Sequence, residues 1–190
     1  MAKGIEWINW GVPDEWLIWP AGDTTAALEL ARERFGSHEA VLDSVLASIV
    51  AMDARFAPSR PTAVGIWAPG DANATAIGYV ALFAWMVANN GRVTLEQRER
   101  ELARIARGET NDPNIIASSV TRCEIAGQPG LRAMESCLDG SGTVYLRVRA
   151  YCFPEWSTDH VWLDAGCVNL LLKDTFEEQV VQIIAGMEVK

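Results

Sequence analysis

The residues with the clearest chemical potential alternate along one predicted strand, residues 143–153. One face of that strand would carry only tyrosine and arginine, namely Tyr145, Arg147, Arg149 and Tyr151. Two guanidinium groups between aromatic rings could clasp a carboxylate or a phosphate, because arginine presents a planar fork of donors to such groups. We therefore predict a ligand-binding face here, with Arg122 or Arg132 as possible additions from neighbouring strands.

The same row also fits a purely structural role. One face of an antiparallel sheet commonly faces water, and its arginines then pair with acidic residues across the strands. Glu124 and Glu135 are the partners that the sequence offers for this purpose. The sequence leaves both interpretations of the arginine row open.

A second cluster consists of tryptophans near the start of the chain. Half of the eight tryptophans fall within the first 20 residues, at Trp7, Trp10, Trp16 and Trp19. If these rings were loose they would expose a large apolar patch, which monomers avoid unless it binds a partner. The segment is therefore either packed over an edge of the core or used for partner binding.

The residues that could support catalysis do not form a recognisable motif. His38 and His160 are the histidines of the chain, and a Cys-His-Asp arrangement of Cys152, His160 and Asp159 can be imagined. Adjacent strand residues point to opposite faces, however, and no motif marks Cys152 as a nucleophile. G-x-S-x-G and glycine-rich phosphate loops are also missing. We expect no catalytic residue and lean against an enzyme.

The sequence has four cysteines, and none of them belongs to a CxxC or CxxH motif: Cys123, Cys137, Cys152 and Cys167. The close ligand pairs of a zinc site are thus absent from the sequence, and we predict neither a metal nor another cofactor. The cysteines are expected to be reduced, small, buried side chains.

Charge and length limit the classes of partner. The formal net charge is -9, with 5 basic and 10 acidic residues in 1–90, 9 and 8 in 91–149, and 2 and 7 in 150–190. Nucleic-acid binding needs basic residues that neutralise phosphates, so it is a poor hypothesis. An acidic surface would instead attract a basic protein partner. The 190 residues suit a single domain, 1–190.

Targeting signals are not evident in the sequence. The first residues carry acidic groups and Pro13 where a signal peptide would have an uninterrupted apolar core. The longest apolar run, residues 77–88, is shorter than the roughly 20 residues of a membrane span. These observations predict a cytoplasmic protein without a membrane association.

The first 110 residues predict helices and one hairpin. A short strand at 4–10 and a Trp- and Pro-rich lead-in at 11–22 precede two helices. One is capped by Asp23 and ended by Gly36, and the other is capped by Ser37 and ended by Pro58. Residues 62–68 and 77–88 are expected to pair as strands. Thr94 and Gln97 predict a capping box for a surface helix that runs to about Gly108.

The second half predicts an antiparallel meander sealed by a helix. Turn signals separate segments 115–126, 131–138, 143–153 and 160–172. Asp174 and Glu177 indicate a capping box for the last helix. Its apolar positions repeat at helical spacing and must lie on the sheet: Phe176, Val180, Ile183, Ile184 and Met187.

Residues 115–189, above all 144–149 and 176–184, resemble the PsbP-like superfamily and its uncharacterised actinobacterial members. The resemblance implies an α+β fold in which an antiparallel sheet is covered by helices in an α/β/α sandwich. Members of the superfamily are mostly non-catalytic binding proteins, including photosystem and nuclear-import accessory factors.

Two functional hypotheses follow from these patterns. The first is a non-catalytic cytoplasmic protein-interaction domain, an accessory or immunity-type factor of bacterial origin. The alternative is a small-molecule binder or enzyme with an anionic-ligand pocket near Arg147 and Arg149. A deep cavity with convergent polar groups would favour the second hypothesis, whereas a flat exposed aromatic patch would favour the first. The oligomeric state does not follow from the sequence.

Overall fold

The computed structural model describes residues 8–69, 77–85, 93–109, 114–157 and 159–190. Its helices are α1 (Thr25–Phe35), α2 (Glu39–Phe56), α3 (Leu95–Ala106) and α4 (Lys173–Ala185), with short 3-10 turns η1 (Ala57–Ser59) and η2 (Leu170–Leu172). Its strands are β1 (Ile8–Asn9), β2 (Trp16–Pro20), β3 (Ala63–Trp67), β4 (Gly78–Trp85), β5 (Ile115–Ile125), β6 (Gln128–Leu138), β7 (Val144–Cys152), β8 (His160–Cys167) and β9 (Glu188–Val189).

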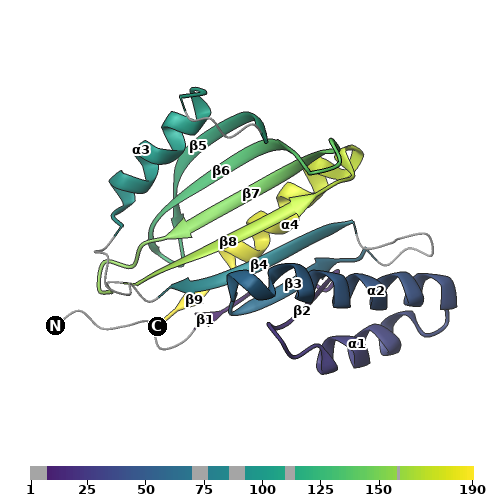
Figure 1. The fold of residues 1–190 in the computed structure, drawn as a ribbon. Helices are drawn as coiled ribbons and strands as arrows, with labels where there is room; N and C mark the ends of the chain where they lie inside the picture. The colour runs from purple at the N-terminus through teal and green to yellow at the C-terminus, as the bar shows by residue number, and fades with distance from the viewer. Residues whose placement is uncertain (1–7, 70–76, 86–92, 110–113, 158) are drawn as a thin grey trace.

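Seven of these strands form one sheet in the order β2-β3-β4-β8-β7-β6-β5 (Figure 1). Every neighbouring pair in that order is antiparallel. The predicted meander over β5 to β8 and the predicted pairing of β3 with β4 are therefore confirmed, although the end of the predicted strand 77–88 lies outside the described residues. The β5–β6 hairpin turns at Ala126 and Gly127, where both residues have positive φ, as the twist of a two-residue hairpin requires.

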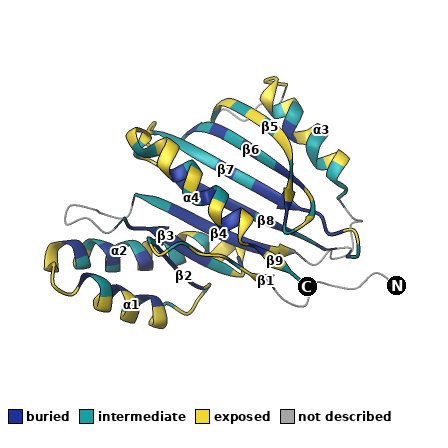
Figure 2. Ribbon diagram, turned by 180° about the vertical axis from the view of Figure 1, so that it is seen from behind, coloured by how far each residue is buried: buried dark blue, intermediate teal, exposed yellow. Residues whose placement is uncertain are grey.

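One face of the sheet is closed by α4, which crosses it diagonally (Figure 2). The helix positions predicted to face the sheet are all buried: Phe176, Val180, Ile183, Ile184 and Met187. They pack against the inward row of β7, Val148, Ala150 and Cys152, and against Val161, Leu163 and Ala165 of β8. The predicted alternation of β7 is thus confirmed, and this face forms the main apolar core.

Helices among the described residues cover the opposite face at its two sides (Figure 1). Helices α1 and α2 pack on β2 and β3, where Leu17, Trp19 and Ile66 belong to their buried cluster. Helix α3 packs on β5 and β6 through Leu102, which belongs to one buried cluster with Leu131 and Tyr151. The result is the predicted α+β fold, an antiparallel sheet with helices on both faces.

The tryptophan-rich lead-in contains a strand that the sequence did not predict. Residues 16–20 form β2 at one edge of the sheet and pair with β3. This strand is held by its pairing with β3 and by burial on both faces. Trp16 and Trp19 are three residues apart and so lie on opposite faces, one in the core under α4 and the other in the cluster with α1 and α2.

Helix ends were predicted with mixed success. The capping box at Thr94 is present, with Gln97 N donating to Thr94 Oγ1 and Thr94 N donating to Gln97 Oε1. The capping box at Asp174 is wrong, because α4 begins at Lys173 directly after η2 and has no side-chain cap. Asn169 caps η2 instead, accepting from Leu171 N.

The caps predicted for the first two helices also differ from the structure. Helix α1 is preceded by Thr24 rather than by Asp23, although Asp23 Oδ1 does accept from Thr25 N at 3.2 Å. Helix α2 is preceded by His38 rather than capped by Ser37. The predicted stop of the first helix at Gly36 is confirmed.

The two ends of the described chain are joined by a small second sheet. Strand β1 pairs with β9, and Gly11 N donates to Gly186 O at 3.1 Å. The start of the predicted strand 4–10 lies outside the described residues. The segment 160–172 ends earlier as a strand than predicted, at Cys167, and β9 was not predicted. Among the described residues, no helix has the length and apolar character of a membrane span.

Candidate functional site

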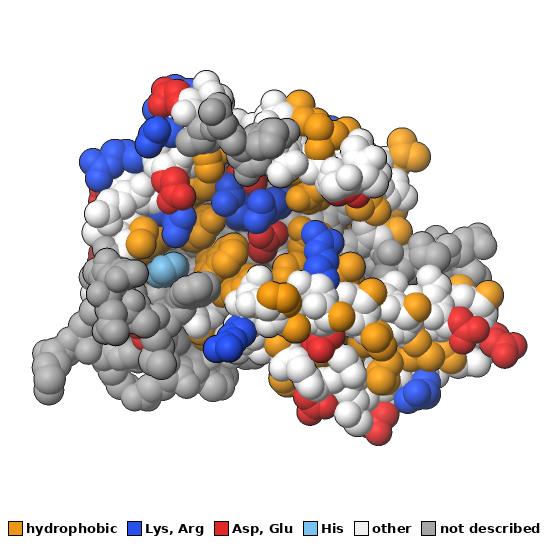
Figure 3. Space-filling view, viewed as in Figure 1, with side chains coloured by type: hydrophobic (Ala, Val, Ile, Leu, Met, Phe, Trp, Pro, Cys, Tyr) orange, Lys and Arg blue, Asp and Glu red, His pale blue; other side chains and the backbone are white. Residues whose placement is uncertain are grey.

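A groove lies on the partly covered face of the sheet, between α2 and the strands β4, β8 and β7. It consists of three adjoining hollows of about 470, 340 and 130 Å³, all of which are lined by Arg55 and Tyr145. Figure 3 shows basic side chains in the middle of this face, next to acidic and hydrophobic ones. We call this feature the sheet-face groove.

A line of polar side chains crosses four strands on this face of the sheet, and three of its members, Tyr79, Arg147 and Asp164, line the sheet-face groove. Arg147 of β7 donates to Asp164 of β8, with Nε 3.0 Å from Oδ2, and Nη2 of the same arginine makes a second contact with that carboxylate. Arg149 Nη2 donates to Glu135 Oε1 of β6. Tyr79 Oη of β4 lies 3.5 Å from Asp164 Oδ1. The two arginines are therefore already paired with two carboxylates.

Both carboxylates of this network are buried. Glu135 is 1% exposed and Asp164 is 5% exposed. Glu135 Oε2 and Arg149 Nε are buried without a hydrogen-bonding partner among the described residues, and Arg147 Nη1 lies 4.0 Å from that carboxylate oxygen. A buried carboxylate depends on its cationic partner, since desolvation otherwise makes the charge costly.

Burial sets the protonation of the phenols in this line. Burial, and next the charge of Asp164, raises the pKa of Tyr79 far above its usual value. Burial likewise raises the pKa of Tyr145 and of Tyr151. For Arg147, burial lowers the pKa, but the hydrogen bond and charge of Asp164 outweigh it, and the net direction is upward. At neutral pH the tyrosines are thus protonated donors and the arginine is a cation.

Arg55 differs from the other arginines of the groove. It comes from the last turn of α2, is exposed, and forms no ion pair with any acidic residue that the structure describes. Its guanidinium lies 4.6 Å from the ring centre of Tyr79 and 5.4 Å from that of Phe56. Such cation–π contacts hold the side chain over the rings.

Tyr79 owes its position to a glycine on the next strand. Gly166 of β8 is the register partner of Tyr79, and a Cβ atom added there would collide with the Tyr79 ring. The missing side chain lets the ring lie directly on β8 beside Asp164. This close approach shapes the groove where its hollows meet.

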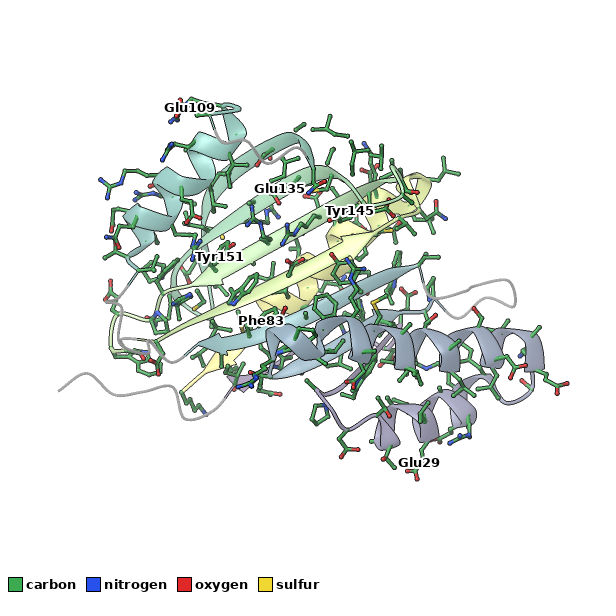
Figure 4. The ribbon with its side chains drawn as sticks, in the orientation of Figure 1. Glu29, Phe83, Glu109, Glu135, Tyr145 and Tyr151 are labelled. Atoms are coloured by element: carbon green, nitrogen blue, oxygen red, sulfur yellow. The ribbon has the colours of Figure 1, made fainter. Side chains whose placement is uncertain are left out.

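Aromatic rings line one end of the groove. Phe83, Trp162 and Tyr151 stand side by side on β4, β8 and β7, with ring centres 4.2 and 5.9 Å apart and nearly parallel planes. Phe83 and Trp162 line the 470 Å³ hollow together with Phe56 and Tyr79. Figure 4 shows Phe83, Tyr145 and Glu135 on this face, between α2 and α3.

The structure distributes the predicted ligand-binding residues unequally. Tyr145 and Arg147 line the groove. Arg149 is paired with Glu135, one of the two partners offered by the structural interpretation, and its Nη1 donates to Tyr151 Oη at 3.3 Å. Tyr151 is 3% exposed and lies against α3. Ligand binding by these residues stays a prediction.

The two additional arginines do not join the row. Arg122 lies at the edge of the sheet and pairs with Glu99 of α3, with Nε 2.7 Å from Oε1. Arg132 lies across β6 opposite Ala150, on the α4 face, 3.8 Å from Glu177. The expectation that either would extend the ligand-binding face is therefore wrong.

The predicted partner-binding tryptophans lie mostly in the core. Trp16 and Trp19 are 2% and 1% exposed, and Trp19 Nε1 donates to Asp53 Oδ1 at 3.0 Å. Trp10 is partly buried against the main core. Trp7 lies outside the described residues. The described rings thus pack over an edge of the core, which was the structural alternative.

Cys152 and His160 cannot form the imagined dyad, because they lie on opposite faces of the sheet. Cys152 is paired in register with Val161 and is buried under α4, whereas His160 stacks on Phe153. Burial raises the pKa of Cys152 to about 12, so its thiol is protonated at neutral pH. In the described part of the chain, all four cysteines are free.

Sequence reasoning missed Arg55 and Tyr79, which come from the first half of the chain. Their side chains meet those of β7 only because β4 is inserted beside β8. The available signal was weak: Tyr79, Ala81 and Phe83 alternate along a predicted strand, and Arg55 ends a predicted helix. Neither pattern says which strand will lie next to them.

Comparisons with known proteins give a likeness of fold alone. No family model matches the sequence, and no curated protein matches it. The structure is similar to LpqN of Mycobacterium tuberculosis, a protein described as involved in cell envelope biogenesis, with 11% identity, a TM-score of 0.52, and 96% of this chain and 83% of that chain covered.

The structure of the cyanobacterial PsbP protein from Synechocystis sp. PCC 6803 is also similar, at 9% identity and a TM-score of 0.43, over 68% of this chain and 75% of that one. The PsbP-like resemblance is therefore a weak likeness of structure. The fold class rests on the topology described above and on the LpqN likeness.

Proposed function

We propose that this protein is a non-catalytic binding domain that takes up a small ligand in the sheet-face groove. One observation carries the proposal: rings and hydrogen-bonding groups from α2, β4, β7 and β8 converge on a hollow of about 470 Å³. Ligand sites are typically concave, mostly apolar and about 300–1,000 Å³ in volume, with few polar groups that orient the ligand.

The state of the polar groups supports binding rather than catalysis. Asp164 and Glu135 are both engaged by arginines, and burial raises the pKa of Tyr79, so its phenol keeps its proton even well above neutral pH. A general base needs a free proton-accepting group within reach of the substrate. The groups that line the 470 Å³ hollow instead offer donors and apolar contact surface, which suits recognition of a ligand.

A second candidate function is binding of a protein partner, at a different place. Three apolar residues after β8 are exposed close together: Val168 at 57%, Leu170 at 42% and Leu171 at 95%. An apolar cluster of this kind is typical of interaction sites. A Leu171→Asp variant that lost a protein captured by the wild type would support this candidate. The cytoplasmic location stays a prediction.

The main proposal can be tested with N-phenyl-1-naphthylamine, a neutral aromatic dye that fluoresces when it enters an apolar site. Ser59 is exposed and lines the 470 Å³ hollow, so a Ser59→Trp substitution should fill that hollow. Ala57 is exposed in the same short turn but lines none of the three hollows, which makes Ala57→Trp the matched control.

We expect saturable dye binding to the wild type and to Ala57→Trp, and at least about tenfold weaker binding to Ser59→Trp, since the indole occupies the site. Thermal unfolding checks that both variants are folded. Equal dye binding by the three proteins, or none by the wild type, would count against the groove as a binding site.

A further inference from the structure

Two charged side chains that line the sheet-face groove, Arg55 and Asp139, form no ion pair with another described residue. Arg147 and Arg149 face Asp164 and Glu135, so these four groups balance one another. Arg55 adds a third cation, and no acidic residue in the described ranges pairs with it. Because Asp139 does not line the 470 Å³ hollow and Asp164 is paired with Arg147, the unpaired charge at that hollow is the positive charge of Arg55.

Arg55 is also positioned before any ligand arrives. Its guanidinium is held over the rings of Tyr79 and Phe56, and Tyr79 is itself fixed against Gly166. Stacking uses the face of the guanidinium and leaves its N–H groups, which lie in the plane, free to donate. An exposed, ordered arginine of this kind is suited to a carboxylate, sulfonate or phosphate group.

The nearby carboxylate of Asp139 limits the orientation in which such a ligand could bind. Asp139 lines the 340 and 130 Å³ hollows, and hydrogen bonds from Ser141 and Thr143 lower its pKa and keep it ionised. It does not line the 470 Å³ hollow, whose walls include the rings of Phe56, Tyr79, Phe83 and Trp162. An anionic group at Arg55 with a body toward those rings avoids Asp139.

We infer that the ligand class is an aromatic oxyanion: a planar ring body in the 470 Å³ hollow and one acidic oxygen group bound by Arg55. This inference rests on the proposed function. Flat rings are favoured because stacked and tilted ring contacts add to the burial of apolar area. The acidic group would receive charge-assisted hydrogen bonds from the guanidinium.

Two dyes with the same ring skeleton isolate the acidic group. The anion 8-anilinonaphthalene-1-sulfonate carries a sulfonate that the neutral N-phenyl-1-naphthylamine lacks. Arg55→Gln removes the charge of the groove arginine. Arg32→Gln, at an exposed position on α1, removes the same charge away from the groove and controls for net charge. Dissociation constants for both dyes are measured by fluorescence titration of the full chain.

We expect Arg55→Gln to weaken sulfonate binding about tenfold, as the loss of a charge-assisted hydrogen bond would, and to change binding of the neutral dye by less than about twofold. Arg55→Lys should give an intermediate loss, because lysine keeps the charge without the planar fork. Arg32→Gln should change neither constant.

The outcomes separate the two proposals. If Ser59→Trp removes neutral-dye binding but Arg55→Gln leaves sulfonate binding unchanged, or weakens both dyes equally, the oxyanion inference is overturned and the groove remains a binding site. If Ser59→Trp leaves both dyes bound as in the wild type, the groove itself is overturned as the site. Sulfonate binding that is weakened both by Arg55→Gln and by Ser59→Trp supports both proposals.

Discussion

The two faces of strand β7 use the same alternation for opposite purposes. On one face Val148, Ala150 and Cys152 are at most 2% exposed beneath α4. On the other, the side chains of Arg147 and Arg149 are 25% and 12% exposed, and their charges are balanced across the strands. One face is closed by the apolar side of α4, whereas the other is left as a groove beside buried ion pairs.

The difference teaches where stability and function reside. Burial of apolar area under α4 stabilises the fold through the hydrophobic effect, which does not depend on how the buried groups are oriented. Buried ion pairs contribute little net stability, because desolvation offsets their attraction, but removing one partner leaves the other buried and unpaired. On the closed face, the effect of a substitution on stability should therefore depend on the change in side-chain size. On the groove face, it should depend on the change in charge.

Truncation of Phe176 should have the largest effect. Its ring is fully buried and contacts Trp16 and Trp67. It also lies so close to Gly78 that a Cβ atom added there would be 2.7 Å from the ring. Phe176→Ala is expected to lower the free energy of unfolding by about 4 kcal/mol, measured by urea denaturation. Leu171→Ala, at a residue 95% exposed, should change it by less than about 0.5 kcal/mol.

Removal of one buried charge on the groove face should come next. Glu135→Gln keeps the shape of the side chain but leaves Arg149 without its ionic partner, at a cost of about 3 kcal/mol. The double variant Glu135→Gln, Arg149→Gln should be destabilised by clearly less than the sum of the two single variants. Additive losses in chemical denaturation would show that the pair is not coupled.

A methyl group on Gly166 tests how closely the groove is packed. Gly166→Ala places a Cβ against the Tyr79 ring and is expected to lower stability by about 2 kcal/mol. It should also disturb dye binding, because Tyr79 lines the groove. A Cβ atom at Gly140 would meet nothing within 4 Å, so Gly140→Ala serves as the control for stability. Unaltered stability of Gly166→Ala would mean that the ring moves aside freely.

Alkaline pH should reveal a pH-dependent contribution to stability from the closed face. Burial raises the pKa of Cys152 from 9.0 to about 12, so between these values the unfolded thiol ionises while the folded one keeps its proton. The contribution is fully present below pH 9 and is lost as pH rises toward 12, at no more than about 1.4 kcal/mol per pH unit. Stability of Cys152→Ala should fall less steeply over this range, as followed by denaturation at each pH.

Much of the fold was predictable because its signals are local. The alternation in β7, the turns between β5 and β8, and the apolar positions of α4 each follow from a few neighbouring residues, and the structure confirms them. β2 was missed because it follows Pro13 closely and carries no turn-bounded strand pattern. β9 has only two residues, which is too short for any periodic signal.

The site was predictable only in part. Tyr145 and Arg147 were found because their row lies within one strand, and their lining of the groove is seen in the structure. Their partners Asp164 and Tyr79 lie on β8 and β4, and the register that brings them together depends on strand order. Arg55 is more distant still, since α2 reaches the groove only by packing on β3.

The amino-acid sequence alone determined the alternation of apolar and polar side chains, the turns, and therefore which residues share a face of each strand. The tertiary structure decided which charged groups meet, which arginine stays without an acidic partner among the described residues, and where the sheet is left uncovered. Local periodicity is encoded within neighbouring residues, whereas pairing of charges from α2, β4, β7 and β8 requires the complete strand order.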